Sequence, residues 1–174
     1  QTIVSRRLNP FEIGVITIGS FDGKGTFNVI KDSVELEGDI RYMAMETKET
    51  IEKEIKRLVK GLEEEFGVTC ELTYTPDYPP LYNDPELTAK VAEILKNAND
   101  PDIKEVKEFP ALPPSEDFAY YAEKFPVCFF YIACSPAGVE KPYFNHHPKF
   151  DIDEAALLVG AKAVGQVVCS SSQQ

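Results

Sequence analysis

The stretch Val34-Glu35-Leu36-Glu37-Gly38-Asp39-Ile40-Arg41-Tyr42 decides the fold of the first half of the chain. Apolar or small residues alternate in it with charged residues, which is the period of a half-buried antiparallel β-strand. The charged face is acidic except for Arg41. The sequence therefore predicts a strand with one face toward a core and a single cation on its other face.

The elements on either side of this strand predict a small two-layer unit. β-Branched residues over Glu12–Ser20 predict an earlier strand, and alternation over Cys70–Tyr74 predicts a later one. Between them, apolar residues at helical spacing predict a helix capped by Thr47 and ended by Gly67. Gln1–Arg7 has the pattern of the end of an earlier helix. The order strand, strand, helix, strand predicts a sheet with a helix on one face.

A second region begins after the proline-rich segment Thr75–Pro80. Its predicted elements are a helix opening at Asp84-Pro85, a strand near Ile103–Phe109, a short helix over Phe118–Lys124 capped by Ser115, a buried strand over Val127–Ala133 and a helix over Ile152–Cys169. A strand, a polar loop and then a helix form an α/β signature. Ligands in such folds bind beyond the carboxyl ends of strands, so we expect a site at the loop Cys134–Phe150.

Composition narrows the class of protein and its partners. With 174 residues, 43% of them hydrophobic, the chain is long enough to bury a core. A formal net charge of -11 opposes binding to nucleic acid or to anionic lipid. The sequence has no apolar run of bilayer length, and its four cysteines include no C-x-x-C pair. We expect a cytoplasmic protein with reduced thiols that binds small molecules, metal ions or other proteins.

Two adjacent histidines, His146 and His147, lie in the polar loop and are the only histidines in the chain. Neutral imidazole is a common ligand for zinc, cobalt or manganese. A catalytic zinc needs about three protein ligands, so this loop does not complete a site. The nearby Asp151 and Asp153 are expected to cap the final helix. From the residues alone, a metal ligand and a solvated loop are both open interpretations.

Arg41 and Asn28 are the other candidates for binding. A guanidinium suits bidentate capture of a substrate carboxylate. The simpler interpretation of Arg41 is that it neutralises Asp39 or Glu37, and Asn28 suits a turn between two strands equally well. The residue pattern alone therefore favours local structural roles for both.

Four stretches in order resemble the dinuclear-metal amidohydrolases that include aminoacylase, hippurate hydrolase, auxin-conjugate hydrolases and N-acetyl-diaminopimelate deacetylase. They are Gln1–Arg6, Thr26–Ile30 with Val34–Gly38, Ser115–Ala119 and His146–Glu154. The resemblance implies an α/β protein in which residues 1–78 form a ferredoxin-like two-layer lid or dimerisation domain (an α+β unit) lacking its first strand. Residues 79–174 would be the C-terminal part of an α/β metallohydrolase catalytic domain. The remaining ligand segments and the glutamate general base are expected upstream, so no catalytic base is expected in this chain.

The same resemblance implies a function and assigns residues to it. The activity would be hydrolysis of the amide bond of N-acyl amino acids or related small conjugates, with two divalent ions (zinc, manganese or cobalt) in the intact enzyme. His146 matches a metal-ligand position, whereas His147 falls at a variable one. Asn28 and Arg41 match substrate-holding positions, the arginine facing the substrate carboxylate. A homodimer through the lid is also expected.

Two other classes of function stay open from the sequence. The chain could be a noncatalytic dimerisation or binding module, because strand edges with free backbone groups pair readily. It could also be a ligand-sensing regulatory domain built on the strand-strand-helix-strand unit. The regulatory hypothesis ranks last because it leaves the histidine loop unexplained.

Overall fold

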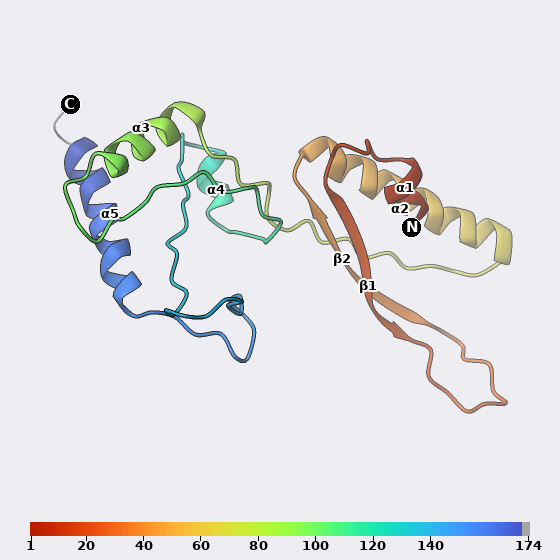
Figure 1. Cartoon of the computed structure of the whole chain (residues 1–174). Helices are drawn as coiled ribbons and strands as arrows, with labels where there is room; N and C mark the ends of the chain where they lie inside the picture. Colours follow the sequence, from red (N-terminus) through yellow and green to blue (C-terminus); the bar gives the residue numbers. More distant parts are fainter. Residues whose placement is uncertain (172–174) are drawn as a thin grey trace. The chain divides into compact units, whose positions relative to one another are not determined.

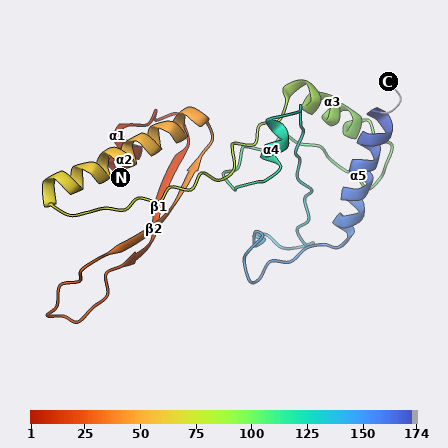
Figure 2. The same ribbon diagram turned by 180° about the vertical axis from the view of Figure 1, so that it is seen from behind.

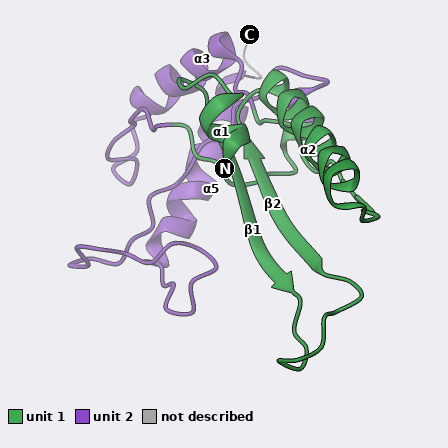
Figure 3. Ribbon diagram, turned by 90° about the vertical axis from the view of Figure 1, so that its right-hand side faces the viewer, with its two compact units in different colours: residues 1–81, 111–120 green, residues 82–110, 121–174 purple. Residues whose placement is uncertain are grey.

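The computed structural model describes residues 1–171 and shows a mixed α/β chain (Figure 1). It divides into two compact units, coloured separately in Figure 3. Unit 1 contains Gln1–Leu81 and Ala111–Tyr120, and unit 2 contains Tyr82–Pro110 and the described residues from Tyr121 onward. The assignment of residues 1–78 to a lid and 79–174 to a catalytic domain stays a prediction.

The sheet of unit 1 is a two-stranded antiparallel hairpin of β1 (Gly14–Asp22) and β2 (Glu35–Tyr42). Gly14 pairs with Tyr42 at one end and Asp22 with Glu35 at the other. The two predicted strands are therefore confirmed with slightly shifted bounds. The expected half-burial of β2 is wrong over most of its length, because only Ile40 and Tyr42 are partly buried. The distal part of the hairpin projects beyond the helices of its unit (Figures 1 and 2).

Two helices pack at the other end of this hairpin, α1 (Thr2–Arg6) and α2 (Met45–Phe66). Ile3 and Ile51 are their buried apolar residues, and Ile51 is fully buried. Gly67 ends α2 as predicted, with a left-handed φ of 66° that glycine adopts at low cost.

Thr47 does not cap α2, contrary to the prediction, because the helix already begins at Met45. The Thr47 side chain instead lies inside the first turn and is 1% exposed. Its hydroxyl donates a hydrogen bond to Glu12 Oε2 at 2.7 Å. This bond satisfies a buried polar group and ties the start of α2 to the chain just before β1.

Three predicted strands are absent from the described residues: Cys70–Tyr74, Ile103–Phe109 and Val127–Ala133 have no helix or strand assignment. A strand needs a hydrogen-bonded neighbour as well as an extended backbone, and the described sheet contains β1 and β2 alone. The third strand of the predicted two-layer lid is therefore not observed. What the structure shows is a mixed α/β fold with a two-stranded sheet.

Unit 2 is built around α3 (Pro85–Lys96) and α5 (Ala155–Ser171). Its buried centre consists of Val91, Leu95 and Ala163. The segment predicted as a buried strand packs against this centre through the partly buried side chains of Cys128, Phe130 and Ile132. The final helix is confirmed, although it begins three residues later than predicted.

Helix caps in the second half of the chain agree in part with the sequence. The helix α3 opens at Asp84-Pro85 as predicted, and the structure shows that Asp84 caps it, because Asp84 Oδ1 accepts the Leu87 amide at 2.8 Å. Asp153 Oδ1 likewise accepts the Ala155 amide at 3.0 Å, whereas Asp151 Oδ1 accepts the Ile152 amide and does not reach α5.

The short helix α4 spans Ala119–Ala122, inside the predicted range. Glu116 replaces the predicted Ser115 at its start: the Glu116 carbonyl accepts the Ala119 amide at 3.2 Å, and Glu116 Oε1 accepts the Phe118 amide at 3.3 Å. None of the helices within residues 1–171 is long and apolar enough to cross a membrane.

The core of unit 1 yields a stability prediction. Replacing the fully buried Ile51 by alanine leaves a cavity under the hairpin, so Ile51→Ala should lower the free energy of unfolding by roughly 3 kcal/mol. Leu62→Ala is the matched control, because Leu62 is on the same helix and 47% exposed. Urea unfolding followed by circular dichroism measures both. Equal effects of the two changes would contradict the described core.

Candidate functional site

The histidine loop of unit 2 connects the extended segment near Ala133 to α5. Its base is closed by a backbone hydrogen bond from the Asp153 amide to the Cys134 carbonyl at 2.8 Å. Between these residues the chain is almost wholly exposed and contains only turns. The loop therefore presents polar side chains from a base fixed against the final helix.

The side chains of His146 and His147 differ in the contacts that they make. The His147 ring stacks on Tyr143, with ring centroids 4.1 Å apart and planes 11° apart. Its Nδ1 accepts the Lys149 amide at 3.0 Å, and Lys149 Nζ lies 5.8 Å from the Tyr143 ring centroid. His147 is thus occupied in holding the loop together.

His146 adopts a φ of 70°, a left-handed value that only His146 shows among the non-glycine residues described. Such a backbone is strained for a residue with a Cβ, and strain of this kind concentrates at functional sites. Within residues 1–171 the structure records no hydrogen bond or ring contact for the His146 side chain. The geometry leaves His146, rather than His147, available for a ligand.

A metal ion finds no complete set of ligands in the described part of the chain. Residues 1–171 contain no group of three or more histidine, cysteine, aspartate or glutamate side chains arranged to hold one. A catalytic zinc needs about three protein ligands. These residues therefore do not fit a resident metal by themselves, and the role of His146 as one ligand stays a prediction.

Arg41 lies near the end of β2 and makes two hydrogen bonds. Its Nε donates to Asp39 Oδ2 at 2.7 Å, and its Nη1 donates to the Pro113 carbonyl at 3.1 Å. Neutralisation by Asp39 was the simpler sequence interpretation, and this ion pair is present, whereas no pair with Glu37 is recorded in the described structure. The guanidinium has more N–H groups than these two bonds use, so it can still bind a carboxylate.

The bond to Pro113 could not be found in the sequence, since the two residues lie 72 positions apart. Both side chains of the ion pair are largely exposed, 43% for Arg41 and 60% for Asp39. Exposed pairs of this kind contribute little to stability. Here the ion pair instead fixes the direction of the Arg41 guanidinium.

Asn28 lies in an exposed turn between β1 and β2, where the Val29 amide donates to the Thr26 carbonyl at 3.1 Å. Its neighbours Phe27 and Ile30 are almost fully exposed. The turn placement agrees with the simpler interpretation of Asn28. Its proposed contact with substrate stays a prediction.

A group of tyrosines next to Arg41 was missed by the sequence analysis. Tyr42 donates its hydroxyl to the Tyr78 carbonyl at 3.0 Å, and the Tyr78 ring meets the Tyr120 ring edge-on at 5.7 Å. Burial raises the pKa of the Tyr42 hydroxyl, and the nearby Tyr74, Asp77 and Tyr120 raise it further. No sequence spacing connects these residues, because they come from three separate segments.

The charged cluster of unit 2 has a structural role. Lys162 on α5 pairs with Asp100 and Asp102, which follow α3. A hydrogen bond from the Asp102 amide, together with Lys162, lowers the pKa of Asp100 against the opposing effect of burial. The cluster ties the loop after α3 to the final helix.

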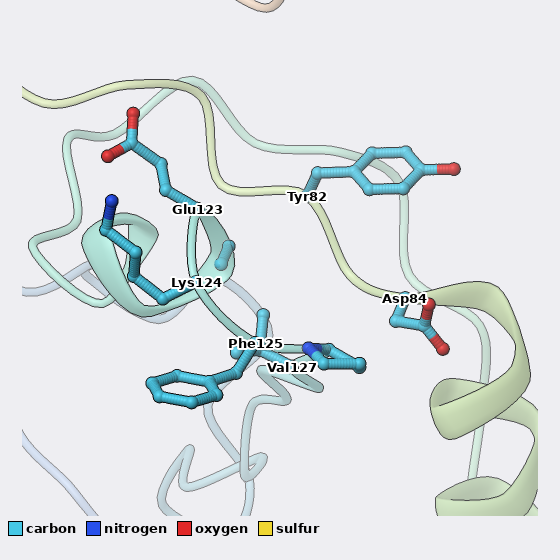
Figure 4. A pocket seen from close by; sticks show the side chains of 8 residues that line it. Tyr82, Asp84, Glu123, Lys124, Phe125 and Val127 are labelled. Carbon is cyan, nitrogen blue, oxygen red and sulfur yellow. The ribbon is translucent and has the colours of Figure 1, made fainter.

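An open pocket of about 300 Å³ lies elsewhere in unit 2 (Figure 4). Tyr82 and Asp84 line one side of it, and residues 122–127 line the other. None of the residues predicted to bind metal or substrate lines this pocket. The candidate residues are thus on exposed loops and strand ends rather than in an enclosed cavity.

Comparison with known proteins shows which class of protein this chain is similar to. A protein of Bacillus subtilis named as amidohydrolase YhaA is 38% identical over 164 residues, covering 94% of this chain. The N-acetyldiaminopimelate deacetylase of Limosilactobacillus fermentum is 34% identical over 174 residues, covering 99% of the chain. A crystal structure from methicillin-resistant Staphylococcus aureus, described as an aminohydrolase, matches with a TM-score of 0.82 and 60% identity over 96% of the chain. The class of similar proteins is therefore that of amide-cleaving hydrolases.

Residues 8–170 match the family described as peptidase family M20/M25/M40. The chain belongs to this family, which confirms the resemblance found in the sequence. It spans 41% and 43% of the lengths of the two curated relatives and 42% of the Staphylococcus aureus chain.

The strained backbone of His146 gives a second prediction. Glycine adopts a φ of 70° without a Cβ penalty, so His146→Gly should be more stable than His146→Ala by about 1 kcal/mol. Both variants remove the imidazole, and they differ only in the backbone cost. Thermal unfolding of the two variants side by side measures the difference. An alanine variant as stable as the glycine variant would mean that the loop is not held in the left-handed conformation.

Proposed function

We propose that this chain acts in a hydrolase that cleaves the amide bond of N-acyl amino acids or related small conjugates. Membership of peptidase family M20/M25/M40 supports the proposal, as does similarity to proteins named as an amidohydrolase and a deacetylase. The observation that carries the substrate class is Arg41, whose guanidinium is held in place by Asp39 and Pro113 with donors to spare.

The chain's own residues have distinct parts in this proposal. Arg41 binds the carboxylate of the amino-acid portion, and Asn28 hydrogen-bonds a polar group of the substrate. His146 supplies one ligand to a divalent ion such as zinc, manganese or cobalt, with further ligands and the glutamate general base outside residues 1–171. His147 and Tyr143 keep the loop folded around His146.

Arg41→Ala tests the substrate class. We expect the KM for an N-acyl amino acid to rise about tenfold, since a hydrogen bond to a charged group at an exposed position is worth about 1.5 kcal/mol. An N-acyl amino acid amide, which lacks the carboxylate, should be cleaved equally by both proteins. The assay follows release of the free amino acid or its amide with added divalent metal. Each variant is introduced into the gene in the source organism, and the protein is captured from there with an antibody against this chain.

The control is Arg57→Ala, because Arg57 is a similarly exposed arginine of unit 1 that pairs with Glu54 on α2. An unchanged KM for the acid in Arg41→Ala would rule out the carboxylate contact. No cleavage of any N-acyl amino acid, with any of the three metals, would rule out the activity itself.

A noncatalytic dimerisation module is the second candidate, and the hairpin favours it. Each strand pairs on one side only in the described sheet, and Ile18, Phe21 and Leu36 are more than half exposed. Open strand edges with apolar side chains pair with other strands. In an intact homodimeric enzyme the same surface would join two lids.

Solution size tests this surface. We expect sedimentation to give a species of twice 19.5 kDa, and Glu37→Pro in β2 should shift it toward the monomer by disturbing strand pairing. The control is Glu37→Gln, because glutamine keeps the backbone N–H of β2 that proline lacks. Glu64→Pro does not serve as a control, because proline would break helix α2. A monomer at micromolar concentration would exclude a homodimer through this hairpin.

A further inference from the structure

The segment Ala111–Tyr120, here called the strap, leaves one unit and joins the other. The residues on both sides of it belong to unit 2, yet the strap itself belongs to unit 1. It carries Ser115-Glu116-Asp117, one of the stretches that resembled the family. What fixes the strap therefore decides where these three polar residues lie within unit 1.

Arg41 holds the first part of the strap through its bond from Nη1 to the Pro113 carbonyl. Pro113 and Pro114 restrict the backbone there, so a single anchor positions several residues. A second nitrogen of the same guanidinium, Nε, is fixed by Asp39. Arg41 thus has its orientation set from two sides.

Tyr42, the next residue of β2, holds the other end of the strap indirectly. Its hydroxyl is bonded to the Tyr78 carbonyl, and the Tyr78 ring packs against the ring of Tyr120. Ala119, beside Tyr120, is fully buried. Two consecutive residues at the end of β2 therefore anchor the strap near both of its ends.

We propose that Arg41 is a positioning residue as well as a substrate contact, and that it couples binding of the substrate carboxylate to ordering of the strap. The inference rests on the proposed function, which puts a carboxylate on the remaining N–H groups of Arg41. A guanidinium already oriented by Asp39 and Pro113 loses less freedom when a carboxylate binds. By reciprocity, the bound carboxylate stabilises the same orientation and so the bond to Pro113.

Hydrogen–deuterium exchange of the strap amides tests the coupling on the full chain. The amides of Ala119 and Tyr120 donate within the strap and report its order. Arg41→Ala should speed their exchange several-fold in the absence of ligand. Saturating N-acetylglycine should slow their exchange in the unchanged protein, whereas its methyl ester should have no effect.

Four variants separate positioning from a general loss of structure. Arg57→Ala removes an exposed arginine of the same unit that contacts Glu54, and it should leave strap exchange unchanged. Tyr120→Phe keeps the ring against Tyr78 and should behave like the unchanged protein, whereas Tyr120→Ala should speed exchange. Arg41→Lys keeps the charge without the planar fork and should lose the protection by N-acetylglycine.

Calorimetry with N-acetylglycine distinguishes failure of this inference from failure of the proposed function. Binding without any change in strap exchange would overturn the coupling and leave the carboxylate contact standing. Strap exchange that is the same in Arg41→Ala and in the unchanged protein would overturn the positioning role. Absence of any N-acetylglycine binding to the unchanged protein would overturn both the carboxylate contact and the coupling.

Discussion

Packing of α2 against the end of the hairpin where Gly14 pairs with Tyr42 is the contact on which unit 1 depends. Ile51 is fully buried there, and Gly14 leaves room for its neighbours Leu8 and Thr47: a Cβ at Gly14 would clash with Leu8 Cδ1 and lie 3.2 Å from Thr47 Cγ2. Gly14 pairs with Tyr42, and Val15 pairs with Arg41. The buried end of the sheet is therefore the end that carries the two residues anchoring the strap, while the distal end is solvated.

Arg41 and the histidine loop are arranged in a similar way. In both regions, contacts with neighbouring residues hold a functional group in place and leave part of it available to bind a ligand. Asp39 and Pro113 take part of the Arg41 guanidinium and direct what remains. In the loop, the stacked His147 and Tyr143 fix the backbone, and His146 stays without a recorded contact in the described residues at a strained φ. Preorganisation of this kind reduces the cost of binding a ligand.

Extended segments account for most of the difference between expected and observed secondary structure. Val127–Ala133 has a strand's composition, yet it has no strand assignment. The Asn83 side chain bonds both the amide and the carbonyl of Phe129 at 2.8 Å, and the Asp84 amide donates to the Val127 carbonyl at 2.8 Å. An asparagine side chain has an NH₂ group that donates and a carbonyl oxygen that accepts, and here it uses both on one residue, as one step of a β-ladder would. A continuous apolar run predicts an extended and buried segment, whereas strand pairing also requires a second strand within hydrogen-bonding distance.

The sequence by itself determined the features that depend on neighbouring residues. The hairpin strands, the end of α2 at Gly67, the start of α3 at Asp84-Pro85 and the histidine loop all follow from local spacing and composition. The family resemblance rests on motifs of neighbouring residues, and the family match confirms it. Tertiary structure alone decided the burial of Thr47 against Glu12, the bond from Arg41 to Pro113 and the tyrosine contacts around Tyr42. These contacts join residues 35 to 72 positions apart, and such pairs form only when the folded chain brings distant segments together.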